Sequence, residues 1–465
     1  MTKQAWQLER EFREAAVPVD RRVTPSSWEQ VEEFPHGDAL LRWFWNVRVP
    51  GSLAPDIFFQ GMVQDWANQG YDVSEAEALI PEGRALEAAG RIEELRVLSA
   101  RIMKALKEAP KIAGHPYHSY EHPSTWEDVK AAMSAAAGYK PLSGWKEQYA
   151  DRIYQGWMGQ LAGGSFGTAL EGYTGSQIAK VYGEVRGYIT APETMNDDVV
   201  YEMLLLDIYE KMGKAMTSDA LGDEWVRKLP YGVSAEGVAL RNLNLGIYPP
   251  ESGTFLNPYC DWIGAQMRGM VCGMLAPGDP MEAARLAHTD AVISHARNGI
   301  YGEIYAAVIT SLAFVMDDPR IIVLEGRCYI PARSEYAAKL TFCLDVLQST
   351  ADPAAAWLEL DKHFERYNWI HAYPNLAADL LALWYGGGEF TESMALLAKA
   401  GYDVDCNGGL VGNVLGVICD VPPAWADPIG DLLETYIKGK ERLSIRALAE
   451  KTASLAKKYQ LSCLL

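Results

Sequence analysis

Apolar residues at helix-type spacing recur along most of this 465-residue chain, and this pattern constrains the fold more than any other feature. The segment 76–107 shows it most clearly: it is rich in Ala, Glu, Leu, Lys and Arg and is predicted to form one helix. Its apolar positions are Ile92, Leu95, Leu98, Ile102 and Leu106. Segments 340–347, 354–364 and 376–384 repeat the pattern, whereas only 321–324 forms a short β-branched run. The sequence therefore predicts an all-α protein with one large central bundle.

Charge and apolar patterning argue against several classes of protein. The formal net charge of -19 opposes binding to a nucleic-acid backbone, which requires clustered lysine and arginine. The N-terminus has no apolar run of the signal-peptide type, and the longest apolar segment, 304–316, is too short to cross a membrane. Seven cysteines without metal-type spacing fit a reducing compartment. We therefore expect a cytoplasmic protein without membrane or nucleic-acid partners, whose oligomeric state stays open.

The sequence changes in character near residue 145. Residues 1–145 hold helical patterns and little polar chemistry, with one helix start predicted by a cap at Ser26 or Ser27 before the segment 28–32. Residues 146–465 hold glycine-rich and acidic motifs between apolar helices. We therefore expect a helical accessory region over residues 1–145 and a catalytic domain over residues 146–465.

Three of the eight histidines lie in the turn-rich segment 114–123. His115, His118 and His122 have ring nitrogens that can bind a transition metal, but their spacing matches no closed tetrahedral site. The segment is therefore interpreted as a surface loop between helices.

Glycine and alanine recur at intervals of three and four residues between Tyr154 and Gly167. Small residues at this spacing let a second helix approach closely. A phosphate-binding loop would need a preceding strand and a Gly-Lys-Ser/Thr ending, which this run lacks. The run therefore predicts a tight helix contact and then a break, after which Glu171 is exposed.

Two pairs of acidic residues carry the strongest indication of chemistry. Asp403 and Asp405 open a glycine-rich run, and an extended backbone before a helix would point both carboxylates the same way. Asp197 and Asp198 precede the apolar helical segment 199–208. Helix capping explains such acids taken singly, but converging carboxylates repel unless a cation or proton lies between them. We expect the fold to bring the two pairs together around metal ions.

Four motifs stand in a fixed order over roughly residues 150–425. They are Gly159–Gly167 with Glu171-Gly172, then Asn196-Asp197-Asp198, then Gly278-Asp279-Pro280 with His295, and finally Asp403-Val404-Asp405-Cys406-Asn407-Gly408. In this order the chain resembles the ADP-ribosylglycohydrolase family. The resemblance implies an all-α, orthogonal helical bundle of that family's type, to which the N-terminal helical region is an extension.

The resemblance also implies a centre that holds two Mg²⁺ or Mn²⁺ ions. By motif, the metal ligands are Asn196, Asp197, Asp198, Asp403, Asp405 and Cys406. Glu171 matches the family's mobile-loop glutamate, and the implied catalytic residues are Glu171, Asp198 and Asp405. The implied reaction is hydrolysis of the C1 bond of a ribose through an oxocarbenium-like state.

The chain departs from the common family motifs at four positions. Asn196 and Val404 stand where threonine is frequent, Cys406 where threonine or serine is frequent, and Ser165 where many members carry aspartate. A thiol is a soft ligand that suits Mg²⁺ poorly, and Val404 removes a hydroxyl beside the ligands. These changes predict that one ion is held weakly or that Mn²⁺ is preferred.

The family name suggests an ADP-ribosylated small molecule or protein as substrate. Only single arginines, Arg241, Arg268 and Arg297, are candidates for binding its pyrophosphate. We expect the substrate to contact Gly164, Ser165, His295, Asn298, Gly299, Tyr301, Glu303 and His371. Two alternatives stay open. One is hydrolysis of a smaller, phosphate-free riboside whose base stacks on aromatic residues, and the other is binding of ADP-ribose or a nucleoside without cleavage. The aromatic residues expected to stack on the base are Tyr259, Trp262, Tyr301, Trp369 and Tyr373.

Overall fold

The computed structural model describes residues 3–26 and 37–461. These residues form twenty-two α-helices, several short 3-10 turns and six strands of two residues each. The prediction of an all-α fold is confirmed. The helix start expected at 28–32 lies outside the described residues.

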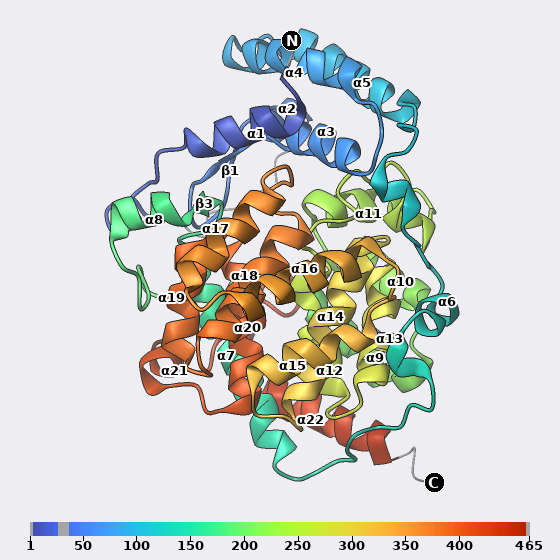
Figure 1. Ribbon diagram of the computed structural model, residues 1–465, viewed down its shortest axis with the longest axis vertical. Coiled ribbons are helices and arrows are strands. Elements are labelled where there is room, and N and C mark those ends of the chain that lie inside the picture. The colour runs from blue at the N-terminus through green and yellow to red at the C-terminus, as the bar shows by residue number, and fades with distance from the viewer. Residues whose placement is uncertain (1–2, 27–36, 462–465) are drawn as a thin grey trace.

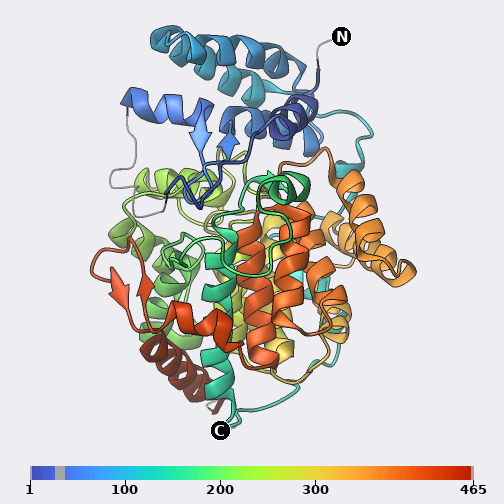
Figure 2. The same ribbon diagram turned by 90° about the vertical axis from the view of Figure 1, so that its left-hand side faces the viewer.

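The N-terminal region contributes a layer of helices over one end of the molecule. Its helices are α1 (Ala5–Glu14), α2 (Gly37–Trp45), α3 (Phe58–Asn68), α4 (Ser74–Ala88), α5 (Ile92–Glu108) and α6 (Trp126–Ala131). Helices α1 to α5 form the layer, whereas α6 lies along the side of the bundle (Figures 1 and 2). The single helix predicted over 76–107 is wrong: α4 and α5 are separate because the chain turns at Gly90, whose φ of +67° suits glycine.

The remaining helices form the main bundle. They are α7 (Tyr149–Gly167), α8 (Gly175–Tyr182), α9 (Val200–Met212), α10 (Ser218–Lys228), α11 (Ser234–Asn244), α12 (Met270–Leu275), α13 (Pro280–Ala291), α14 (Asn298–Ala313), α15 (Pro319–Gly326), α16 (Glu335–Ser349), α17 (Pro353–Phe364), α18 (Ala372–Tyr385), α19 (Phe390–Ala400), α20 (Val404–Ile418), α21 (Pro423–Ile429) and α22 (Ile445–Leu461). Every residue of α14 is buried, and so is α20 except for Ile418. These two helices therefore belong to the interior of the bundle.

The strands form three antiparallel pairs. They are β1 (Val47–Arg48) with β2 (Pro55–Asp56), β3 (Tyr173–Thr174) with β4 (Gly401–Tyr402), and β5 (Leu433–Glu434) with β6 (Arg442–Leu443). No single helix in the described part of the chain has the length and apolar character of a membrane span. The pair α20 and α21 has both, but the two helices are bent by 116° relative to each other.

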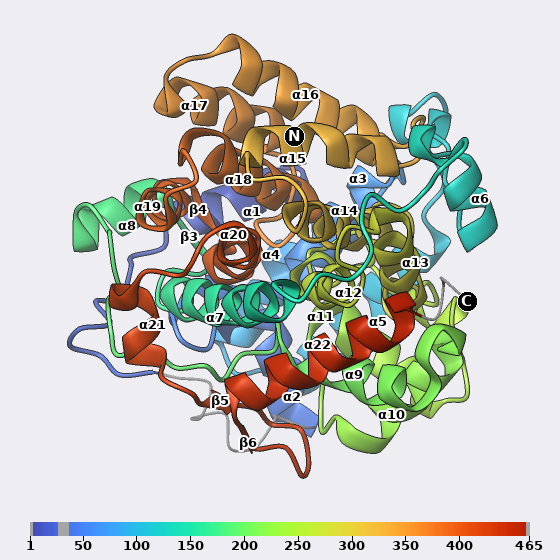
Figure 3. The ribbon, with the colours of Figure 1, turned by 90° about the horizontal axis from the view of Figure 1, so that it is seen from below.

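Helices α7 and α20 make the most extensive helix contact in the molecule and lie side by side (Figures 1 and 3). Gly159 faces Gly412 and Gly163 faces Gly408, and a β-carbon on any of the four would overlap the carbonyl oxygen of the facing glycine. A β-carbon on Gly167 would likewise overlap the backbone of Asp405. The small-residue spacing thus lets backbone pack on backbone and sets the start of α20 against the end of α7.

Two adjacent glycines of α7 give a matched test of this contact. In Gly163→Ala the new methyl group meets the Gly408 carbonyl, so we expect the free energy of unfolding to fall by about 3 kcal/mol. In Gly164→Ala the β-carbon meets only the Asp405 carbonyl oxygen at 3.9 Å, so stability should be unchanged or rise by up to about 1 kcal/mol. Urea unfolding measures both, and equal stability of the two variants would contradict the contact.

Candidate metal centre

Three segments far apart in the sequence bring carboxylates to one place. Glu171 follows α7, Asp197 and Asp198 precede α9, and Asp403 and Asp405 lie at the start of α20. The β3–β4 pair ties the first segment to the last. Across it Tyr173 lies opposite Tyr402, and the N–H of Gly172 donates to the Tyr402 carbonyl at 2.8 Å. Glu171 and Asp403 are each one residue from these contacts, so the short pair fixes them beside each other.

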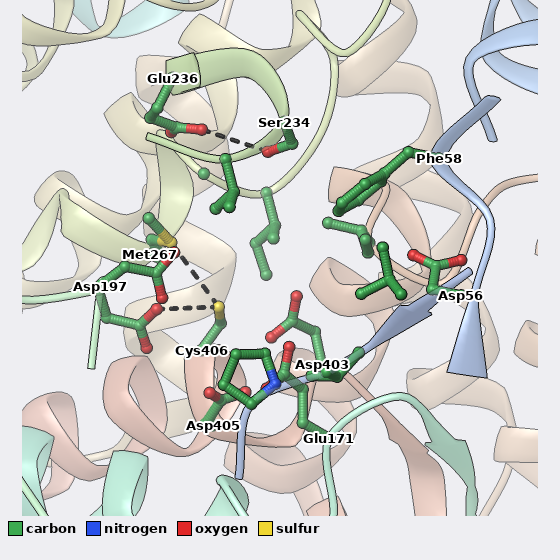
Figure 4. Close-up of a pocket in the computed structure, with 18 of the residues that line it drawn as sticks. Asp56, Phe58, Glu171, Asp197, Ser234, Glu236, Met267, Asp403, Asp405 and Cys406 are labelled. Atoms are coloured by element: carbon green, nitrogen blue, oxygen red, sulfur yellow. Dashed lines mark hydrogen bonds between the residues drawn. The ribbon is translucent and has the colours of Figure 1, made fainter. Parts of the chain in front are cut away.

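The carboxylates face a cavity of about 150 Å³ between the N-terminal layer and the bundle. The acidic side chains that line it are Asp56, Glu171, Asp197, Asp198, Glu236, Asp403 and Asp405. Figure 4 shows Glu171, Asp403, Asp405 and Cys406 clustered on one side, with Asp56 and Phe58 on a second side and Glu236 on a third. The cavity therefore has a carboxylate-rich floor and separate walls.

Hydrogen bonds hold part of this floor in position. The Asn196 amide donates to Asp405 Oδ2 at 2.9 Å, and its Oδ1 accepts from the backbone N–H of Asp198 at 3.2 Å. The Cys406 thiol donates to Asp198 Oδ1 at 3.2 Å. Asn196 does not line this cavity. Its amide orients two of the expected ligands.

Several oxygens of the floor are buried without a hydrogen-bond partner. These are Asp403 Oδ1, Asp405 Oδ1 and Glu171 Oε2. Asp403, Asp405 and Cys406 can each offer one ligand atom, and these three atoms lie within 4.8 Å of one another. Buried carboxylate oxygens are costly unless they are paired, and hard divalent cations bind such oxygens. The residues present therefore fit a metal centre of the Mg²⁺ or Mn²⁺ type.

The electrostatics of the floor point the same way. Burial, and next the Asp405 charge, raise the pKa values of Glu171, Asp198 and Asp403 well above the ordinary range. The same causes raise the pKa of Asp197 to about 8. Burial, followed by Asp198 and Asp403, also raises the pKa of the Cys406 thiol, which therefore stays protonated as a donor. Without a cation the carboxylates cannot all be ionised at neutral pH, whereas bound cations would favour their charged forms.

Gly164 and Ser165 lie behind this floor and do not line the cavity. They border a much smaller space of about 10 Å³, together with Asn196 and Asp198. The Ser165 hydroxyl donates to the Glu193 carbonyl at 2.6 Å. The sequence predicted that Gly164 and Ser165 contact the substrate, but their position outside the cavity does not support this prediction.

The other residues expected to contact the substrate do not line the cavity either. They are His295, Asn298, Gly299, Tyr301, Glu303 and His371. Several of their polar groups bond inside the bundle: His295 Nδ1 lies 2.8 Å from Ser294 Oγ, and the Tyr301 hydroxyl donates to the Pro123 carbonyl at 2.8 Å. At Gly299 a β-carbon would overlap the Cys260 carbonyl oxygen. In the sequence, polar residues that bond to other parts of the protein look the same as polar residues that line a ligand cavity.

The three single arginines are placed away from the cavity as well. Arg268 is buried, with Nη1 at 2.7 Å from Glu236 Oε1 and Nε at 2.5 Å from Asp290 Oδ2. Arg297 donates to Gln69 Oε1 at 2.9 Å. Neither these two nor Arg241 lines the cavity. The guanidinium of Arg268 instead orients Glu236, which is part of the lining.

The walls of the cavity are formed by residues that were not predicted from the sequence. The N-terminal region supplies Trp43, Val47, Arg48, Val49, Pro50, Asp56 and Phe58, and the bundle adds Tyr231, Val233, Ser234, Glu236, Ile263, Gly264, Met267, Trp369 and Ile370. No local motif marks the N-terminal residues, whose bulky apolar character is also typical of a core. Of the five aromatic residues that were expected to stack on a base, Trp369 alone lines this cavity.

The chain was compared with known protein families, sequences and structures. A solved structure described as an ADP-ribosylglycohydrolase-related protein complex is 19% identical, with a TM-score of 0.46, and the match covers 68% of this chain and 100% of the other. No curated protein sequence gives a significant match. The family model for ADP-ribosylglycohydrolase matches residues 145–463. Because this match covers most of the chain, the protein belongs to the ADP-ribosylglycohydrolase family, whose members are generally metal-dependent hydrolases of glycosidic bonds.

Proposed function

We propose that the protein hydrolyses the C1 bond of a ribosyl substrate with the help of two Mg²⁺ or Mn²⁺ ions. One observation carries the proposal: five carboxylates from three distant segments converge on one cavity, and several of their oxygens are buried without partners. Asp197, Asp198, Asp403 and Asp405 are the proposed ligands, with Cys406 at their edge. Residues 146–465 form the proposed catalytic domain, and residues 1–145 the accessory region.

The proposed chemistry divides between the ions and the chain. Ions of this type, when bound, supply positive charge for the carboxylates and make water acidic. Glu171 holds the proton of the attacking water at its unpartnered Oε2 and acts as general base. Asn196 keeps the Asp405 carboxylate oriented. The apolar walls exclude bulk water from the ribose carbon.

Two substrate classes suit this reaction. ADP-ribosylated substrates follow from the family name. Phosphate-free ribosides are favoured by the lining, because Arg48 is the one cationic side chain in the described cavity wall and is itself exposed to solvent. A pyrophosphate needs several N–H donors or cations. The positive charge of bound metal ions would already be neutralised by the carboxylates of the floor.

A metal add-back screen tests the proposed function. After chelation, neither ADP-ribosyl-arginine nor ribonucleosides should be hydrolysed, and added Mg²⁺ or Mn²⁺ should restore release of the free leaving group. The thermal midpoint should rise with metal, because an ion that binds only the folded state stabilises it. Calorimetry and product chromatography provide the measurements. Absence of product from every ribosyl compound with either ion, or binding of ADP-ribose without cleavage, would contradict the proposal.

A further inference from the structure

The N-terminal region, which lies outside the family match, closes one side of the cavity. It does so through the β1–β2 hairpin, in which Val47 pairs with Asp56, and through Phe58 at the start of α3. The connecting turn packs directly on the segment before Glu171, since a β-carbon on Gly51 would overlap Thr168. The proposed catalytic domain therefore does not complete its own cavity.

Arg13 of α1 fastens this wall to the Glu171 turn. Its buried guanidinium donates to the carbonyls of Gly172 at 2.6 Å and Pro55 at 2.8 Å, and it pairs with Asp56 Oδ1 at 3.2 Å. It also lies over the Trp369 ring, 4.9 Å from the centroid. One cation thus sets the position of Asp56 relative to Glu171.

The wall and the floor offer different surfaces to a ligand. The floor consists of carboxylates, which with their metal ions suit the hydroxyl groups of a ribose. The wall is aromatic: the Trp43 and Phe58 rings lie 5.0 Å apart and both border the cavity, with Trp369 also in the lining. Aromatic faces bind flat rings by stacking. The base of a bound riboside would therefore contact the aromatic wall.

Asp56 is the polar group of this wall. Its side chain is buried, and Oδ1 is occupied by Arg13 and by the backbone N–H of Ile57 at 2.8 Å. The other oxygen, Oδ2, is buried without a hydrogen-bond partner, and the Trp369 indole, whose N–H also has none, lies near enough to act against the rise that burial causes in the pKa of this carboxyl. Figure 4 places the Asp56 carboxylate beside Phe58 at the cavity. A buried oxygen of this kind is stabilised when a ligand donates a hydrogen bond to it.

We propose that the N-terminal region forms the leaving-group subsite, in which Phe58 and Trp43 stack on a flat heterocyclic base and Asp56 Oδ2 accepts a hydrogen bond from an N–H group of that base. The substrate class is a phosphate-free N-riboside. This inference rests on the proposed function, because the floor must hold the ribose. Residues 37–58 would then select the leaving group and so determine which ribosyl bond is hydrolysed.

The test uses the full-length, metal-loaded protein and C-linked ribonucleosides, which bind but lack a hydrolysable C–N bond. Two such probes are compared, with and without an amino group on the base. In Asp56→Asn binding of the amino-bearing probe should weaken about 10- to 100-fold, with a smaller change for the other. Glu9→Gln is the control, since Glu9 also pairs with Arg13, at 3.5 Å, but does not line the cavity. It should leave both affinities unchanged.

A second pair of variants tests the aromatic wall. Phe58→Leu keeps an apolar side chain but removes the ring, and it should weaken both probes about 10-fold. Phe59→Leu is the neighbouring control, because Phe59 stacks on Trp45 at 4.9 Å and lies outside the lining. Circular dichroism checks that all four variants fold.

The outcomes separate this inference from the proposed function. Equal effects of Asp56→Asn and Glu9→Gln, or of the two phenylalanine variants, would overturn the subsite. Faster cleavage of ADP-ribosyl-arginine than of any nucleoside would also overturn it while leaving ribosyl hydrolysis intact. Absence of hydrolysis of every ribosyl compound would refute the proposed function itself.

Discussion

Asp405→Asn should abolish turnover and metal binding, while the helical circular dichroism spectrum should stay that of the wild type. We expect a loss of activity of about 10³-fold or more, because Asp405 is a proposed ligand at the centre of the floor. In the metal-free protein the same change should raise the thermal midpoint. Asp405 is the neighbouring charge that most raises the pKa of Glu171, Asp197, Asp198 and Asp403, so its removal relieves repulsion.

Two measurements decide this prediction. Steady-state assays with Mg²⁺ and Mn²⁺ report turnover, and thermal scans with and without metal report binding. Asp420→Asn is the matched control, since Asp420 is an exposed residue just after α20. Wild-type activity in Asp405→Asn, or a metal-induced rise in its thermal midpoint equal to that of the wild type, would refute the proposed centre.

Arg268→Met should destabilise the protein strongly. Arg268 is buried and holds Glu236 and Asp290 at hydrogen-bond distance, with Glu303 at 4.0 Å. Methionine fills a similar volume but leaves these acids without their cation, so we expect the free energy of unfolding to fall by about 3–5 kcal/mol. The Tyr201 and Trp225 rings, each about 5 Å from the guanidinium, also lose their cation.

Arg285→Met provides the comparison for this effect. Arg285 is partly exposed and bridges Glu282 one helical turn away at 2.8 Å, and such pairs contribute less than about 1 kcal/mol. Denaturant unfolding of both variants gives the two free energies. Similar losses for Arg268→Met and Arg285→Met would show that the buried network contributes little to stability.

The parts of the fold and centre that the sequence predicted are those encoded by local pattern. Glycine spacing in 154–167 indicated the close helix contact. The acidic pairs at 197–198 and 403–405 indicated a cluster of carboxylates, and all four line one cavity. The split between α4 and α5 was missed because one turn at Gly90 interrupts a continuous helical composition.

The walls of the cavity depend on packing that no local pattern records. Phe58 and Asp56 face the cavity only because α1 and the β1–β2 hairpin dock on the Glu171 turn. The polar segment around His295 and Asn298 looked like a cavity lining because its polarity is the same whether a ligand or another side chain satisfies it. Only the three-dimensional partners distinguish the two cases.

The contact between α7 and α20 also fixes the order of events during synthesis. Asn196 and Asp405, which hydrogen-bond to each other beside the floor, are 209 residues apart. The facing glycines join segments that are even farther apart in the chain. Such non-local contacts form late, because the intervening chain must first be made and closed into a loop. The segments that carry Glu171, Asp197 and Asp198 therefore cannot join Asp403 and Asp405 before α20 has been synthesised. The nascent chain therefore exposes separate acidic segments, and the complete set of carboxylates forms only near the end of translation.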